Sequence, residues 1–430
     1  MNRWMWIWCA CLLSPLSAIP NAVLGAVHEE ASPLADQDLT DQMLAGVWKS
    51  GEKLPGTWRE EGMVETASIE HLLARPKILG AKVTLVRSIK REDVLESLEI
   101  TYADAGSFFG YFQEDEQAPK NLTRKEQIAH IQQQMQQRQQ EFSEQYASAL
   151  DTVRSGLEAF TGEDRPKRVK IGKTRALRAE VDEWETKSGQ VIRLWADGQR
   201  MIRVTVHASA AQAGDWIDAS IRKLDARARA HLLAEKVTKA EDGTVSLSSI
   251  KPIPQGYQPY CGLNTLAMAA RHFGLHVDED WLAVAGKFQN TGSAAGSDIL
   301  GLYSAVASEV NLRMDRQTRL SAADVRRSID QGLPVIVWRR FSHERNQLHN
   351  QHMQRLKSDA TATLPDPADP QERASWPDRS APLHASVIVG YHPQRGEFLF
   401  LESWTGKDQA RRMRVQEMEA TTYYAFVFGK

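Results

Sequence analysis

A polar stretch over residues 233–252 divides this chain into two parts whose hydrophobic patterns differ. Before it, strand-like alternation dominates and is interrupted by one long helical pattern. After it, helical patterns come first and strand-like patterns come last. A chain of 430 residues is long enough for two or three domains. We therefore predict an α+β fold, with an α+β domain over 27–232, a linker over 233–252 and a second domain over 253–430.

The first domain is predicted from strands on both sides of a long helix. Alternating or β-branched runs indicate strands at 81–89, 94–103, 174–186, 190–198 and 201–209. Between them a helical pattern opens near Asn121, where Thr123 and Glu126 match a capping box. We find no catalytic constellation in this part of the sequence, so its role stays open.

The second domain is predicted to place helices before an antiparallel sheet. Helices are expected over 261–273, 298–310 and 321–332, and strands over 334–338, 384–392, 397–404 and 421–428. A polar, Pro-rich insert over 339–383 enters directly before the strand that begins at His384. We predict that the insert forms a lid or wall on a cleft. Its His343, His349 and His352 are expected to be surface residues of an amphipathic helix rather than metal ligands.

Residues 1–26 have the layout of a signal peptide. Arg3 gives a positive end, Trp4 to Leu13 form a compact apolar run, and small residues follow up to Ala26. The apolar run is about half the ~20 residues that a membrane-spanning helix needs. The sequence thus predicts an exported protein, periplasmic or secreted, with a cleaved signal peptide and no stable membrane span. A net charge of −2 gives no indication of nucleic acid as a partner.

An exported chain that keeps one cysteine raises the question of what its thiol does. Cys9 and Cys11 lie in the predicted signal peptide, which leaves Cys261 as the only cysteine of the mature chain. Such a thiol is either buried and inert or reactive. Cys261 lies in the first turn of its predicted helix, where unpaired N–H groups and the helix dipole favour a thiolate. Its own N–H and the side-chain amide of Gln255 or Gln258 could donate to an oxyanion.

A thiolate nucleophile needs a base, and the base needs an orienting group. His384 begins an apolar, β-branched strand, so its ring can face a cleft while the residues after it fill the core. The next strand would bring Glu402 or Ser403 beside His384. A carboxylate at that point could accept the imidazole N–H and fix the tautomer and orientation of the ring.

Two segments of the sequence resemble one known family. IPQGYQPYCGLNTLAMAARHFG, residues 253–274, looks like the nucleophile segment of the C39-like cysteine peptidases within the papain-like superfamily. LHASVIVGYHPQRGEFLFLESWTG, residues 383–406, is similar to the papain-like histidine strand and its successor. The resemblance covers residues 253–429 and none of the first domain. It implies a papain-like cysteine peptidase domain, with N-terminal helices and a C-terminal antiparallel sheet, that requires no metal or organic cofactor.

The resemblance also implies a role for each candidate residue. It makes Cys261 the nucleophile, His384 the general base and then acid, and Gln255 the oxyanion-hole donor. Glu402 becomes the orienting third member, although relatives usually carry Asn or Asp there. Trp404 is expected to shield the pair of His384 and Glu402 from water.

The function predicted from these residues is an exported cysteine-dependent hydrolase of peptide or other amide bonds, acting on a peptide or protein substrate. Two alternatives stay open. One is an acyltransferase or deamidase on the same scaffold, which differs only in the molecule that attacks the thioester intermediate. The other is a binding module that has kept the fold but lost turnover.

Overall fold

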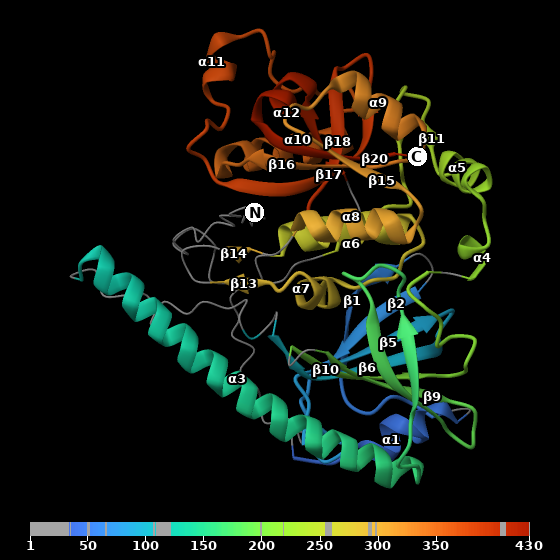
Figure 1. Ribbon diagram of the computed structural model, residues 1–430. Coiled ribbons are helices and arrows are strands. Elements are labelled where there is room, and N and C mark those ends of the chain that lie inside the picture. Colours follow the sequence, from blue (N-terminus) through green and yellow to red (C-terminus); the bar gives the residue numbers. More distant parts are fainter. Residues whose placement is uncertain are drawn as a thin grey trace.

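The computed structural model contains two β-sheets with helices between and around them (Figure 1). It describes residues 34, 36–49, 52–64, 67–105, 108, 122–197, 200–217, 219–253, 260–290, 295–296, 299–404 and 410–429. The predicted signal peptide and Gln255 lie outside these residues. No helix in the described part is both long enough and apolar enough to cross a membrane. The mixed helix and sheet content agrees with the predicted α+β class.

The first sheet is antiparallel and takes strands from both sides of helix α3 (Arg124–Thr161). Its order is β1-β2-β5-β6-β10-β9-β8-β7, and the two sets of strands meet where β6 pairs with β10. The strands are β1 (Trp58–Val64), β2 (Ala67–Leu72), β5 (Leu85–Arg91), β6 (Val94–Asp104), β7 (Lys167–Ile171), β8 (Ala179–Glu185), β9 (Val191–Asp197) and β10 (Met201–His207). The predicted strands at 94–103, 190–198 and 201–209 correspond to β6, β9 and β10. Those predicted at 81–89 and 174–186 begin too early, because Ala81 and Lys82 pair in a separate short hairpin and a turn precedes β8.

Shorter elements complete the first half and the connections. They are α1 (Thr40–Leu44), the 3-10 helix η1 (Gly46–Trp48), the hairpin of β3 (Lys77–Ile78) and β4 (Ala81–Lys82), α4 (Ala219–Arg222), α5 (Ala226–Glu235) and the pair β13 (Gln289–Asn290) and β14 (Ala295–Gly296).

Helix α3 runs diagonally past the first sheet (Figure 1). The predicted capping box is present: the Glu126 N–H donates to Thr123 Oγ1 at 3.4 Å, and the Thr123 N–H donates to Glu126 Oε2 at 2.8 Å. The helix ends at Gly162, whose φ of 72° suits a residue without Cβ. Phe142 and Leu157 are among its residues that pack into the core under the sheet.

Gly156 of α3 packs against the β3–β4 hairpin. A Cβ at Gly156 would lie 2.7 Å from the carbonyl oxygen of Leu79. Helix propensity alone predicts that alanine would stabilise this helix by about 1 kcal/mol. We expect Gly156→Ala to lower the free energy of unfolding by about 1–3 kcal/mol instead, because the helix must move away from the hairpin.

Urea unfolding of wild type, Gly156→Ala and Ser155→Ala measures this effect. Ser155 is the exposed neighbour on the same helix, so Ser155→Ala should leave the unfolding midpoint unchanged or raise it slightly. An unchanged midpoint for Gly156→Ala would contradict the expectation.

The second sheet has the order β11-β12-β17-β16-β20-β15, and β18 and β19 extend it from β17. Its strands are β11 (Thr238–Lys239), β12 (Val245–Ser246), β15 (Arg313–Gln317), β16 (Val335–Arg340), β17 (Leu383–His392), β18 (Glu397–Leu401), β19 (Arg411–Arg414) and β20 (Thr422–Gly429). The predicted linker contributes β11 and β12, and β12 pairs with β17 through Val245 and Tyr391. All residues of β17 are buried, and because side chains alternate between the faces of a strand, both faces are covered at β17.

Helices surround this sheet where the sequence predicts them. They are α6 (Cys261–His272), α7 (Glu279–Ala285), α8 (Ile299–Glu309), α9 (Ala322–Asp330) and α12 (Val415–Thr421). Helices α6 and α8 lie between the two sheets (Figure 1), and α6 packs against β16 and β17. The predicted helices over 261–273, 298–310 and 321–332 are therefore confirmed.

The insert folds as two helices, α10 (His343–Ser358) and α11 (Pro370–Ala374). His343 is exposed, but His349 and His352 are fully buried, so the expectation that all three lie at the surface was wrong. The reason is a tertiary contact. Arg345 of α10 donates to both carboxylate oxygens of Glu417, at 2.8 and 2.6 Å, which turns this face of the helix inward.

A cluster of three tryptophans joins the two halves of the structure. Trp195 of β9, Trp216 and Trp281 of α7 are each less than a tenth exposed, and their ring centroids lie 5.2–5.9 Å apart. The carbonyl oxygen of Leu177 accepts from the indole N–H of Trp216 at 3.1 Å and of Trp281 at 3.2 Å. The halves therefore share one packed core here, and the domain boundary near residue 232 stays a prediction.

Ion pairs also connect the two halves of the structure. Arg203 of β10 donates to Asp278 at 2.8 Å and to Asp280 at 3.2 Å, and Arg87 of β5 donates to Asp280 at 2.8 Å. Arg203 and Asp280 are buried. Because a buried charge that loses its partner is costly, these contacts favour a single arrangement of the two halves.

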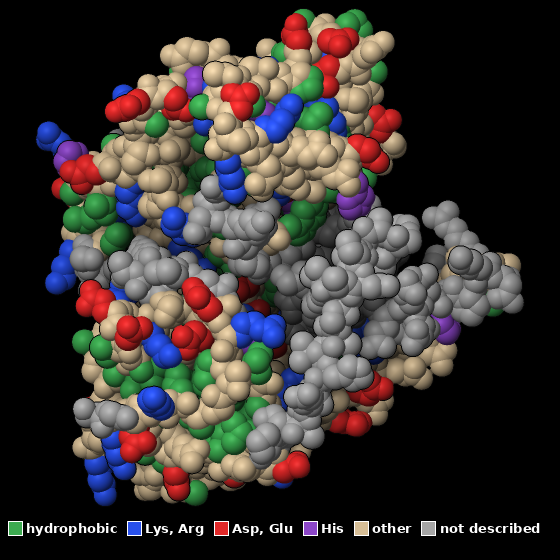
Figure 2. All heavy atoms as spheres, turned by 180° about the vertical axis from the view of Figure 1, so that it is seen from behind, with side chains coloured by type: hydrophobic (Ala, Val, Ile, Leu, Met, Phe, Trp, Pro, Cys, Tyr) green, Lys and Arg blue, Asp and Glu red, His purple; other side chains and the backbone are tan. Residues whose placement is uncertain are grey.

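The surface carries both signs of charge. Figure 2 shows basic and acidic side chains next to one another on both halves of the face in view. This mixture agrees with the small net charge of −2.

Candidate active site

Cys261 is the first residue of α6, as predicted. Tyr260 in the N-cap position gives no side-chain hydrogen bond to the first turn. The partial positive charge of a helix N-terminus favours an anion such as a thiolate. Cys261 is present as a thiol and is fully buried. Burial in apolar surroundings is typical of inert cysteines, so the position of this residue and its burial point in opposite directions.

The first turn of α6 packs on the strand next to the one that carries His384. A Cβ at Gly262 would lie 2.8 Å from the indole ring of Trp338, and the Tyr303 hydroxyl donates to the Gly262 carbonyl at 3.2 Å. The Trp338 indole N–H donates to that hydroxyl at 3.4 Å. Trp338 in turn pairs with Ala385, the residue after His384. Helix α6 thus begins at the end of the sheet where β17 starts.

His384, Glu402 and Trp404 lie together. Nε2 of His384 is 3.6 Å from Oε1 of Glu402, and both residues are buried. The Trp404 ring stacks on the His384 ring, with centroids 3.9 Å apart and planes 27° apart. Among the described residues, Nε2 of His384 has no hydrogen-bond partner. Catalytic contacts of this length are common before substrate binds. The predicted proximity of His384 and Glu402 is confirmed, while their roles stay predictions.

Two arginines contact the carboxylate of Glu402. Nη2 of Arg339 donates to Oε1, and Nη2 of Arg411 donates to Oε2. The Ser386 hydroxyl also donates to Oε1, at 3.1 Å. Burial by itself raises the pKa of Glu402, but Arg411 and Arg339 outweigh it, with His384 adding to their effect, and lower this pKa to about 2. The side chain is therefore a carboxylate at any ordinary pH.

Arg339, Arg411 and Ser386 are site residues that were not predicted from the sequence. A signal was present for Arg339, because it directly follows the buried apolar run of β16, and a buried guanidinium requires a counter-ion. The strand of Arg411, RRMR, gives no such signal. The alternation of side chains along the strands explains why these residues lie together. Arg339 of β16 is opposite His384 of β17, and Ser386, two residues after His384, points to the same face of β17. The sequence does not show that Glu402 is the partner of Arg339, because the two residues are 63 positions apart.

The remaining candidate residues are Gln255, Gln258 and Ser403. Gln255 and its alternative Gln258 lie outside the described residues. Ser403, the alternative to Glu402, is buried. Asn264, one turn after Cys261, donates from Nδ2 to the Ile253 carbonyl at 3.0 Å, which fixes the chain two residues before Gln255.

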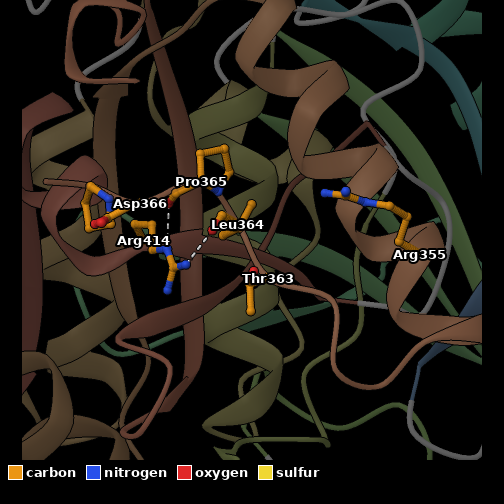
Figure 3. Close-up of a pocket in the computed structure, with 7 residues that line it drawn as sticks. Arg355, Thr363, Leu364, Pro365, Asp366 and Arg414 are labelled. Atoms are coloured by element: carbon orange, nitrogen blue, oxygen red, sulfur yellow. Dashed lines mark hydrogen bonds between the residues drawn. The ribbon is translucent and has the colours of Figure 1, made fainter. Parts of the chain in front are cut away.

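A separate surface pocket of about 510 Å³ lies in the insert (Figure 3). It is lined by Arg355, Thr363, Leu364, Pro365, Asp366, Pro367 and Arg414. Figure 3 shows Arg414 directed at the backbone of the facing loop, where it donates to the carbonyls of Pro365 and Leu364. Cys261, His384 and Glu402, the predicted site residues that the structure describes, do not line this pocket.

Comparison with known proteins agrees with the resemblance seen in the motifs. Residues 247–429 match the model of the family described as "Peptidase_C39 like family". A solved C39-like peptidase from Bacillus anthracis is 15% identical, with a TM-score of 0.29, and the match covers 44% of this chain and 98% of that one. For the peptidase domain of Streptococcus ComA, a bi-functional ABC transporter involved in quorum sensing, the identity is 15%, the TM-score 0.27 and the coverage 42% and 98%. No curated protein matches. The family match confirms the resemblance for the C-terminal part of the chain only.

Proposed function

We propose that residues 253–430 form a cysteine peptidase in which Cys261 is the nucleophile, His384 the base and Glu402 the group that orients the imidazole. The observation that carries the proposal is the surroundings of His384. Its Nε2 faces Glu402 at 3.6 Å, and Trp404 stacks on its ring. Gly262, the residue after Cys261, packs on Trp338, which pairs with Ala385, the residue after His384. The family match supports the same chemistry.

In the proposed reaction the thiolate of Cys261 attacks the carbonyl carbon of a peptide bond. The backbone N–H of Cys261 and the side-chain amide of Gln255 donate to the oxyanion. His384, as imidazolium, gives its proton to the nitrogen of the leaving amine while the C–N bond breaks and a thioester remains. Water, deprotonated by His384, then attacks the thioester and releases the carboxylic acid and the thiol. No cofactor takes part in these steps.

We also propose that the protein is exported and meets its peptide or protein substrate outside the cytoplasm. The layout of residues 1–26 supports export. N-terminal sequencing of the mature chain tests it, because export with cleavage predicts a start at or near Val27, and a mature chain that retains Met1 would contradict it.

The test of the proposed function is the alkylation rate of Cys261 as a function of pH. Iodoacetamide is added to the full-length protein, and modification is quantified by mass spectrometry on the peptide that contains Cys261. We expect half-maximal reactivity at least about one pH unit below the ~8.5 of an ordinary thiol, because a helix N-terminus and an imidazolium stabilise the thiolate. His384→Ala should lower the rate at neutral pH by at least about tenfold.

The matched control is His231→Ala. His231 lies on α5, is largely exposed and faces Glu235, so its removal should leave the rate unchanged. Slow alkylation with an ordinary midpoint, unaffected by His384→Ala, would contradict the proposed function.

A second candidate is a binding module without turnover, and the complete burial of Cys261 favours it. The same alkylation experiment separates the two functions. An acyltransferase or deamidase would share the reactive thiol, and product analysis with added amines distinguishes it, because an acyltransferase gives amide products where a peptidase gives free acids.

A further inference from the structure

The surroundings of Glu402 contain more positive charge than the carboxylate needs. Arg339 and Arg411 are each 2% exposed, and one carboxylate faces both guanidinium groups. Buried charges are costly unless they are paired, so one arginine would be enough to neutralise Glu402. The second guanidinium calls for an explanation other than neutralisation.

Both guanidinium groups are held by further contacts. Their central carbons lie 5.2 Å and 5.6 Å from the centre of the Phe400 ring, for Arg339 and Arg411 respectively. Nε of Arg339 donates to the Ser386 hydroxyl at 3.1 Å, and that hydroxyl donates to Glu402 at 3.1 Å. Each oxygen of the carboxylate therefore accepts from an arginine, and Oε1, the oxygen nearer to His384, also accepts from Ser386.

Arg411 also reaches the insert. Its Nη1 donates to the side-chain oxygen of Asn346 on α10. Helix α10 packs against β19, and Arg345, the residue before Asn346, is bound by Glu417 and Glu372. A chain of contacts thus runs from α10 through Arg411 to Glu402, and it ends beside His384.

We propose that Arg339 and Arg411 are positioning residues that hold the carboxylate of Glu402 beside His384, and that Asn346 makes the insertion helix α10 part of this support. The inference rests on the proposed function, because positioning matters only if His384 acts on Cys261. It extends that function by giving α10 of the insert a role in positioning Glu402, and through Glu402 the imidazole of His384.

The experiment measures the pH midpoint of Cys261 alkylation in the full-length protein. Arg411→Gln removes the guanidinium that donates to Oε2 of Glu402, so the carboxylate can turn away from His384. An imidazolium without this oriented anionic partner stabilises the thiolate less. We expect the midpoint to rise by at least about 0.5 pH unit in Arg411→Gln, with Arg411→Lys close to wild type and Asn346→Ala shifted in the same direction by less.

The control is Arg412→Gln. Arg412 is the next residue of β19, and it pairs with Asp242 and Glu397, both at 3.6 Å, so its loss should leave the midpoint unchanged. Thermal unfolding identifies variants that do not fold. If Arg411→Gln fails to fold, Asn346→Ala decides the question.

The outcomes distinguish the two proposals. Suppose that the midpoint is lowered in wild type and is the same in a folded Arg411→Gln. This result overturns the positioning role and leaves the proposed function standing. If Arg411→Gln does not fold, an unchanged midpoint in a folded Asn346→Ala has the same meaning. An ordinary midpoint in wild type overturns both. An equal shift in Arg412→Gln also overturns the positioning role, because it shows a general effect of charge.

Discussion

Replacing Cys261 with alanine is expected to lower peptide hydrolysis by at least about 10⁴-fold, to the uncatalysed background. The thiolate forms the covalent intermediate of the proposed reaction, and alanine offers no atom that could take its place. The measurement compares wild type and Cys261→Ala on a denatured protein mixture, with mass spectrometry of newly formed N-termini. Cys261→Ser should be as inactive, because an alcohol is far less acidic than a thiol.

The control for this prediction is Met268→Leu, a volume-conserving change at a buried position of the same helix. It should retain most of the activity, since swaps of this kind disturb packing little. If Cys261→Ala formed the same new N-termini as wild type at a similar rate, the assignment of the nucleophile would be wrong.

The second large effect is expected at the joint between the two halves. Trp281→Ala should lower the free energy of unfolding by about 3–5 kcal/mol. Trp281 is 2% exposed, and its ring lies 5.6 Å from that of Trp195 and 5.9 Å from that of Trp216. Alanine leaves a cavity there and removes one of the two donors to the Leu177 carbonyl.

Equilibrium unfolding in urea, followed by tryptophan fluorescence and circular dichroism, measures this loss. Because the halves share this core, both signals should change in one transition in wild type. Trp404→Ala is the control, because Trp404 is 40% exposed and its removal should cost clearly less. A loss below about 1 kcal/mol for Trp281→Ala would show that the cluster contributes little to stability.

Several elements near the candidate site were predicted correctly because their signals are local. The helix that begins at Cys261 follows from apolar residues at three- and four-residue steps and from Gly274 at its end. The strand that begins at His384 follows from a run of apolar and β-branched residues. The turn between β17 and β18 is short, so the proximity of His384 and Glu402 could also be anticipated.

Other features could not be predicted, because they depend on partners far away in the sequence. His349 of the insert helix is buried because its face of α10 is bound to Glu417, 68 positions away. The first domain has no motif to show that Trp195 would pack on Trp281. Short strands such as β12 form only because an edge of the second sheet is available to pair with them.

The sequence by itself determined the helix of Cys261, the strand of His384 and the resemblance that connects them. Spacing and apolar periodicity are properties of neighbouring residues, so they can be read without coordinates. Only the tertiary structure decided that Glu402 is held between Arg339 and Arg411, and that Cys261 is buried. A buried charge takes its partner from whichever strand the fold brings near, and the chemistry of the site depends on that choice.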